Sequence, residues 1–156
     1  MPALPAVLAV LLLACASGAP ASPDPVPSPD LAPEAVVKIV VGALQQNDEP
    51  ADDAGIATAF RFASPGNQAA TGPLARFTAM IRGGYSDMLD FERATYGRMV
   101  FQGDEAAQRV TLVQANGRRS TYVFALSKQV GGECDGCWMT DAVVPVAPQD
   151  DGLIRT

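Results

Sequence analysis

The sequence predicts an α+β fold in which N-terminal helices pack on an antiparallel four-stranded sheet. Three observations lead to this prediction. Apolar residues follow a helical period in the first half of the chain, β-branched and aromatic residues dominate the second half, and tight turns separate the strand-like segments. Within the 156 residues, pattern and turn signals place one α+β domain at residues 31–146.

The first predicted helix begins after Asp30 or Pro33 and ends before Pro50. Its apolar residues recur at the spacing of one helix face: Val36, Ile39, Val40, Ala43 and Leu44. A second helix is predicted to begin near Asp52 or Asp53, either of which can serve as its N-cap. This helix carries Ile56, Ala59, Phe60 and Ala63 on one side.

The segment "SPGNQAATG", residues 64–72, is predicted to be a loop from its composition. Pro73 suits the first position of a third helix, which Gly83 and Gly84 would end. The inward-facing residues of that helix would be Leu74, Phe77 and Ile81. A short turn over residues 86–90 then leads to the sheet.

Four strand-like segments follow. The first covers residues 91–101, and the next two, 107–114 and 119–130, flank Asn116-Gly117, the strongest short signal for a hairpin turn. The last strand is predicted at residues 137–146. Consecutive strands joined by tight turns pair antiparallel, which gives the sheet of the predicted fold.

The N-terminus has the features of a signal peptide, predicted at residues 1–16. The run "AVLAVLLLACASGA" is apolar but too short to span a bilayer, and Ala14 and Ala16 frame an A-x-A cleavage site. Cleavage after Ala16 is favoured, although only the terminal amine supplies positive charge before the run. The alternative is a lipoprotein-type site that leaves the mature chain lipid-anchored at Cys15. An uncleaved membrane anchor fits the length least well.

The predicted mature chain is therefore exported to a periplasmic, luminal or extracellular compartment and has no membrane span. Residues 17–30 are rich in Pro and Ala and are expected to form a linker, and residues 147–156 a flexible tail. The net charge of −6 without a basic cluster argues against nucleic acid and against an anionic membrane surface. The absence of histidine argues against His-based triads and most catalytic zinc sites, so neither a metal nor a cofactor is expected.

A C-x-x-C pair, Cys134 and Cys137, precedes the last strand. One interpretation is a redox dithiol, but the pair does not open a helix, and Glu133 and Asp135 disfavour a thiolate. A metal site would need two further ligands. Because Cys15 leaves with the signal peptide, an even pair remains in an oxidising compartment. A structural disulfide or buried free thiols are therefore favoured over redox catalysis.

Two stretches resemble a known family: "FRFASPGNQAATGP" at residues 60–73 with Phe77 and Met80 beyond it, and "GCWMTDAV" at residues 136–143. Together they are similar to the domain-of-unknown-function family 4864, over most of the predicted domain. The resemblance implies a cone-like fold similar to nuclear transport factor 2, in which helices close over a curved sheet and form a pocket. The family has no established activity, so the resemblance leaves the function open.

Candidates for chemistry are the carboxylates and phenols that would line such a cone. Asp141 lies mid-strand among apolar residues, where an unpaired acid is costly. With Tyr122, or alternatively Tyr85 or Tyr96, as hydrogen-bond donor, it would form the acid–base pair of a small isomerase or dehydratase. The favoured alternative is that Asp141 points outward or pairs with Arg61, because the chain lacks the histidine partner common in such sites.

The predicted pocket residues are Phe60, Phe77, Trp138 and Asp141. Ser64 and Asn67 admit two interpretations: ligand-binding groups at the pocket mouth, or the turn that ends a helix before Pro65, which is favoured. The sequence thus leaves two functional classes open. The first is a non-catalytic module that binds a hydrophobic small molecule or a protein partner, and a homodimer is one form that it can take. The second is the small enzyme built on Asp141.

Overall fold

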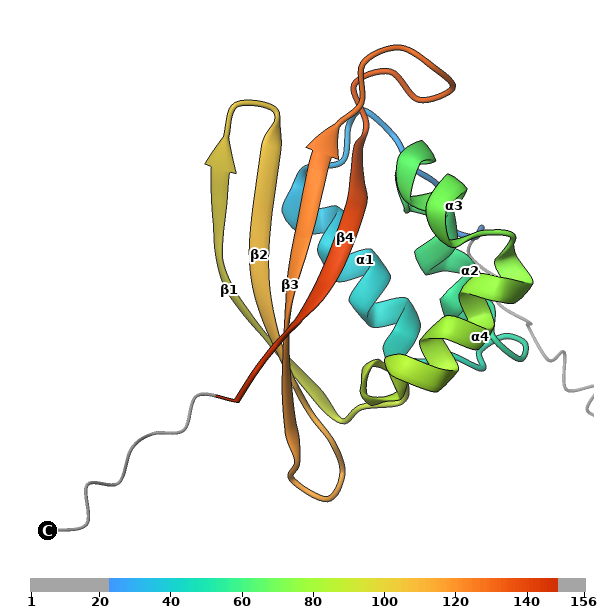
Figure 1. Cartoon of the computed structure of the whole chain (residues 1–156), viewed down its shortest axis with the longest axis vertical. Helices are drawn as coiled ribbons and strands as arrows, with labels where there is room; N and C mark the ends of the chain where they lie inside the picture. Colours follow the sequence, from blue (N-terminus) through green and yellow to red (C-terminus); the bar gives the residue numbers. More distant parts are fainter. Residues whose placement is uncertain (1–22, 149–156) are drawn as a thin grey trace, which may run out of the picture.

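The computed structural model describes residues 23–148 and has two layers, with the helices gathered on one face of a single sheet (Figure 1). The elements are α1 (Pro33–Gln45), α2 (Ala54–Arg61), α3 (Pro65–Thr71), α4 (Leu74–Gly84), η1 (Ser86–Met88), β1 (Arg93–Gln102), β2 (Glu105–Val113), β3 (Arg119–Lys128) and β4 (Trp138–Val146). This arrangement confirms the predicted α+β class. The predicted signal peptide lies outside the described residues, as do most of the predicted tail and part of the linker.

Helix α1 packs its apolar face against the sheet and α2. It begins with Pro33 at its first turn, as predicted, and ends at Gln45. Its buried side chains are Val36, Val37, Val40, Val41 and Leu44. Val37 and Val41 are thus buried, whereas the predicted Ile39 and Ala43 are only partly buried. The buried face of the helix is therefore turned slightly from the predicted face.

A buried asparagine joins α1 to α2. Asn47 is fully buried, and its side-chain oxygen accepts a 3.0 Å hydrogen bond from the backbone N–H of Ile56. Its amide donates to Asp48 at 2.9 Å and to Asp53 at 3.0 Å. Asp53 precedes α2 as predicted, but its side chain makes no capping bond to the helix. Instead the carboxylate accepts a 2.9 Å hydrogen bond from Arg82 of α4.

The segment predicted to be a loop contains a helix, α3, so that prediction was wrong. Ser64 caps it by accepting a 3.3 Å hydrogen bond from the backbone N–H of Asn67, and Pro65 occupies the first turn. The turn-like residues at its start are the normal residues of a helix N-terminus, and composition alone cannot separate the two cases. Helix α4 follows, with Pro73 at its N-cap rather than at its first position.

The four strands form an open antiparallel sheet in the order β1-β2-β3-β4, with β1 and β4 at its edges. The β2–β3 hairpin contains Gly117 with φ 83°, which agrees with the predicted Asn-Gly turn. Side chains facing the helices close the core: Val110, Leu112, Tyr122, Phe124 and Leu126. Within residues 23–148, no helix is long and apolar enough to cross a membrane.

A β-bulge interrupts β4. Leu126 pairs with Thr140 and Ala125 pairs with Ala142, so Asp141 has no partner residue on β3. On the other side of β4, the backbone of residues 62–64 adds a short parallel bridge. The N–H of Thr140 donates to the Phe62 carbonyl at 2.9 Å, and the N–H of Ser64 donates to the Thr140 carbonyl at 2.8 Å.

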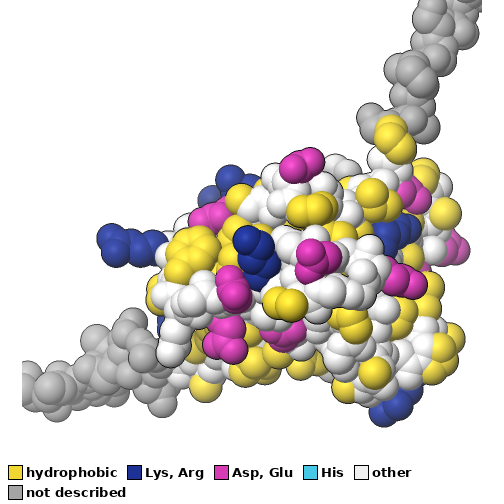
Figure 2. All heavy atoms as spheres, turned by 90° about the horizontal axis from the view of Figure 1, so that it is seen from above, with side chains coloured by type: hydrophobic (Ala, Val, Ile, Leu, Met, Phe, Trp, Pro, Cys, Tyr) yellow, Lys and Arg dark blue, Asp and Glu magenta, His cyan; other side chains and the backbone are white. Residues whose placement is uncertain are grey.

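Charged side chains are scattered over the surface. Seen from above, acidic and basic groups alternate with apolar ones, and the described residues show no broad basic area on this face (Figure 2). This distribution agrees with the absence of a basic cluster in the sequence.

Candidate functional site

A cavity of about 520 Å³ lies between the helical layer and the sheet. Most of its wall is apolar, and α1, α4 and β3 contribute the large apolar side chains Val40, Leu44, Phe77, Met80, Ile81 and Phe124. All of these except Met80, which is 36 % exposed, are buried core residues. Helix α3 lies beside β4, and both elements contribute to the cavity wall (Figure 1).

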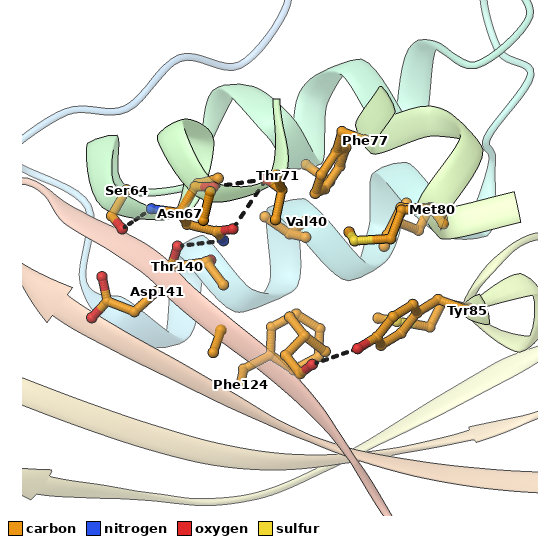
Figure 3. A pocket seen from close by; sticks show the side chains of 18 of the residues that line it. Val40, Ser64, Asn67, Thr71, Phe77, Met80, Tyr85, Phe124, Thr140 and Asp141 are labelled. Atoms are coloured by element: carbon orange, nitrogen blue, oxygen red, sulfur yellow. Dashed lines mark hydrogen bonds between the residues drawn. The ribbon is translucent and has the colours of Figure 1, made fainter. Parts of the chain in front are cut away.

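The polar groups of the cavity gather mainly at one end, where α3 meets the bulge of β4. Ser64, Asn67, Thr140 and Asp141 lie there, whereas Tyr85 lies at the opposite end (Figure 3). The Asn67 amide donates a 3.1 Å hydrogen bond to the backbone carbonyl of Thr140. That carbonyl also accepts from the Ser64 N–H, so the polar end is fixed by backbone contacts.

Thr140 carries the least expected feature of the site. Its side chain is 4 % exposed and lines the cavity, and its Oγ1 has no hydrogen-bond partner among the described residues. A buried hydroxyl without a partner costs about 1–3 kcal/mol. The cost is avoidable with valine, which has the same shape. The Thr140 hydroxyl is therefore open to a further hydrogen bond at the wall of the cavity.

Asp141 is the only charged side chain among the described residues that line the cavity. It is exposed, and its side chain makes no ion pair or hydrogen bond within residues 23–148. Arg61, the structural partner considered from the sequence, instead lies 3.8 Å from Asp24 and donates to the carbonyl of Pro25 at 2.9 Å. Because it is the bulge residue, Asp141 stands at the mouth of the cavity rather than within the strand pairing.

The three tyrosines considered as donors occupy different places. Tyr85 lines the cavity and donates a 3.4 Å hydrogen bond to the carbonyl of Val143. Tyr122 packs beside it, with ring centroids 6.1 Å apart, and burial raises the pKa of its hydroxyl. Burial also raises the pKa of Tyr96, which lies on β1 with the Lys38 ammonium 6.0 Å from its ring. Neither Tyr96 nor Tyr122 is among the described residues that line the cavity.

The structure brings together two of the four predicted pocket residues, Phe77 and Asp141. Phe60 packs behind Phe77, with ring centroids 5.1 Å apart. Trp138 packs edge-on against Phe101 at 6.1 Å, at the far end of β4. Ser64 and Asn67 both line the cavity, and they form the N-terminus of α3 instead of the predicted turn.

Sequence reasoning missed Thr140 as a site residue. Its neighbour Asp141 was noticed because a charge interrupts an apolar strand, but a threonine in a strand is unremarkable. The only local signal was the pair of polar residues in adjacent positions, Thr140 and Asp141, which breaks the alternation of a regular strand. Such a break is what a bulge produces.

Cys134 and Cys137 form a disulfide in the loop between β3 and β4. Cys137 is fully buried, and neither cysteine lines the cavity among the described residues. The disulfide closes the loop next to Gly131, Gly132 and Gly136, all of which have positive φ. Of the two favoured alternatives, a disulfide or buried free thiols, the structure has the disulfide, and it lies apart from the candidate site.

Fold and site together define a small α+β domain with an apolar cavity between its layers. Residues 30–150 match the family described as "Domain of unknown function (DUF4864)", so the chain belongs to this family. Neither the curated proteins nor the solved structures contain a match to it.

Proposed function

We propose that this domain is a non-catalytic binding module that holds a small, mostly apolar molecule in its cavity. The observation that carries the proposal is the buried hydroxyl of Thr140, which lines an apolar cavity and has no partner among the described residues. The volume of about 520 Å³ is within the range of ligand sites, about 300–1,000 Å³. Apolar walls supply the affinity in such a site, and a few polar groups fix the orientation.

We further propose that the mature protein works outside the cytoplasm and that its layers belong to the cone type of nuclear transport factor 2. The disulfide supports export, because such bonds persist in oxidising compartments. The order of helices before an antiparallel sheet supports the fold comparison. Sequencing the N-terminus of the protein from its own cells would test the predicted cleavage after Ala16.

Binding is tested by fluorescence titration with Nile red, a neutral apolar dye. We expect its emission to rise on addition of the wild-type protein. Ala70→Phe should weaken the dye's affinity, because Ala70 lines the cavity from the exposed side of α3. Ala69→Phe is the matched control, since Ala69 is exposed on the same helix and is absent from the cavity wall. A wild-type protein that leaves the dye unchanged would contradict the proposal.

Native mass spectrometry of the protein from its own cells gives an independent test. Comparison with the denatured chain should reveal a retained small molecule as a mass difference. A bare chain together with absent dye binding would remove the case for a binding module.

Self-assembly is a second candidate role, favoured by one feature of the sheet. The face away from the helices exposes Val100 by 62 % and Val144 by 53 %. Light scattering should then give a dimer that Val144→Lys dissociates, whereas Val130→Lys, in a loop and 90 % exposed, should not. A wild-type monomer at all accessible concentrations would dismiss this role.

A further inference from the structure

The charge of the cavity is one-sided. Among the described residues that line it, the ionisable side chains are those of Asp141 and Tyr85. No lysine or arginine is among these lining residues. Arg61, the cation considered from the sequence as a partner of Asp141, is held by Asp24 and by the Pro25 carbonyl. An anionic group entering the polar end would therefore meet a carboxylate and find no opposite charge.

Most of the amide donors of the polar end are already used within the protein. The backbone N–H of Ser64 and the amide of Asn67 donate to the carbonyl of Thr140, and the backbone N–H of Asn67 donates to the Ser64 hydroxyl. The hydroxyl of Thr71 donates to the Asn67 carbonyl at 2.7 Å. Two groups of the polar end have no partner among the described residues: the Thr140 hydroxyl, which can donate and accept, and the Asp141 carboxylate, which can only accept.

We propose that the cavity takes a molecule with a protonated amine on an apolar body, and that the ammonium binds at the β4 bulge between the Thr140 hydroxyl and the Asp141 carboxylate. This inference rests on the proposed binding function. An ammonium has three donors, so it can donate to the Thr140 hydroxyl oxygen and to the Asp141 carboxylate together. A carboxylate ligand could accept only from the Thr140 hydroxyl and would meet the like charge of Asp141. The apolar body then lies between Val40, Phe77 and Phe124.

The position of Asp141 at the mouth decides how such a ligand would sit. Because the side chain is exposed, the ammonium keeps part of its hydration and avoids the large cost of a fully buried charge. The same exposure limits the gain from the ion pair and makes it sensitive to salt. Selectivity between head groups therefore comes from repulsion of anions as much as from attraction of the ammonium.

Three ten-carbon probes that differ only in their head group test the inference: decylamine, decanol and decanoate, each below its micellar concentration. Decylamine is protonated at neutral pH, like the side chain of lysine. Backbone NMR titration of the labelled full chain gives the affinities. The largest shift changes are expected at residues 140–142. We expect decylammonium to bind most tightly and decanoate at least tenfold more weakly.

Two variants assign the effect to its residues. Asp141→Asn should lower the affinity for decylammonium about twofold to fivefold and leave decanol unchanged, since an exposed ion pair contributes little. Asp104→Asn makes the same change of net charge at an exposed turn away from the cavity wall, and should change nothing. Thr140→Val should weaken both decylammonium and decanol.

The outcomes separate the two levels of the proposal. Equal or tighter binding of decanoate would overturn the head-group inference and leave the binding module standing. The inference would also be overturned if Asp141→Asn left the ratio of the decylammonium and decanol affinities unchanged. If none of the three probes binds, the inference fails together with the proposed function.

Discussion

The backbone N–H of Ser64 donates a 2.8 Å hydrogen bond to the carbonyl of Thr140, which joins the helical layer to the edge strand of the sheet. Asn67 reinforces the contact from the first turn of α3. The backbone of Thr140 is thereby satisfied on both sides, while its side chain is left without a partner among the described residues. At the polar end of the cavity, the backbone of Thr140 is thus held by hydrogen bonds, while its hydroxyl has no partner among the described residues.

Replacement of Thr140 by valine is expected to leave the protein as stable or to stabilise it by up to about 1 kcal/mol, because an unpaired buried hydroxyl is removed without a change of shape. Thr58→Val is the matched control. Thr58 is also buried, but its hydroxyl donates a 3.1 Å hydrogen bond to the Ala54 carbonyl, so its loss should cost about 1 kcal/mol. Denaturant unfolding of both variants measures the difference.

A clear loss of stability in Thr140→Val would show that the hydroxyl has a partner in the folded protein without ligand. That result would remove the main support for a site at this place. Stability retained together with weaker probe binding would instead identify a residue kept for binding at some expense in stability.

Substitution of Gly55 by alanine is expected to destabilise the domain by about 1–3 kcal/mol or more. A Cβ at this position would overlap the backbone carbonyl oxygen of Ala43 and lie 2.9 Å from the Cα of Asn47, where neither neighbour can move aside. Gly42→Ala is the control, because its Cβ would meet nothing within 4 Å in the interior of α1. That variant should gain about 0.5–1 kcal/mol. Equal effects of the two substitutions would contradict the close approach of α1 and α2.

The sequence was sufficient for the parts of the fold that local pattern determines. The apolar period of α1 and the Asn116-Gly117 hairpin are properties of short segments, and both appear in the structure. Helix α3 was missed because its first residues also fit a turn. The helix also makes a tertiary contact that no local pattern contains, the hydrogen bond from Asn67 to the Thr140 carbonyl.

The residues of the candidate site were also predicted only in part. Asp141 stood out because a charge in an apolar strand is locally conspicuous, and Phe77 followed from the face of its helix. The role of Thr140 depends on the bulge register of β4 and on the bridge to Ala63. Both features join segments far apart in the chain, and no local pattern in the sequence contains them.

The stability of the α1–α2 junction is expected to depend on pH through Asp53. The hydrogen bond from Arg82, followed by that from Asn47, lowers the pKa of this carboxyl. Such a carboxyl stabilises the folded protein fully at pH values above its pKa in the unfolded chain, about 3.9. This contribution is lost as the pH falls through the lower pKa of the folded protein. The effect is modest because both side chains are partly exposed.

Asp53→Asn tests this dependence with little change to the backbone, since asparagine also tolerates the left-handed φ of 60° found there. The melting temperature of the variant should lie below that of the wild type at pH 7, and the two should converge below about pH 4. A gap that stays constant from pH 7 to pH 3 would mean that the charge of Asp53 is not the cause.

The disulfide is expected to stabilise its loop and to take no part in binding. Closing four residues with a disulfide contributes about 2 kcal/mol through the entropy of the unfolded chain. The double variant Cys134→Ala with Cys137→Ala should therefore unfold at lower denaturant concentration. It should bind Nile red like the wild type, because neither cysteine lines the cavity among the described residues.

Insulin reduction separates this structural role of the disulfide from redox catalysis. The wild type should reduce insulin no faster than the double variant, and a rate that depends on the two cysteines would make the C-x-x-C pair a redox centre after all.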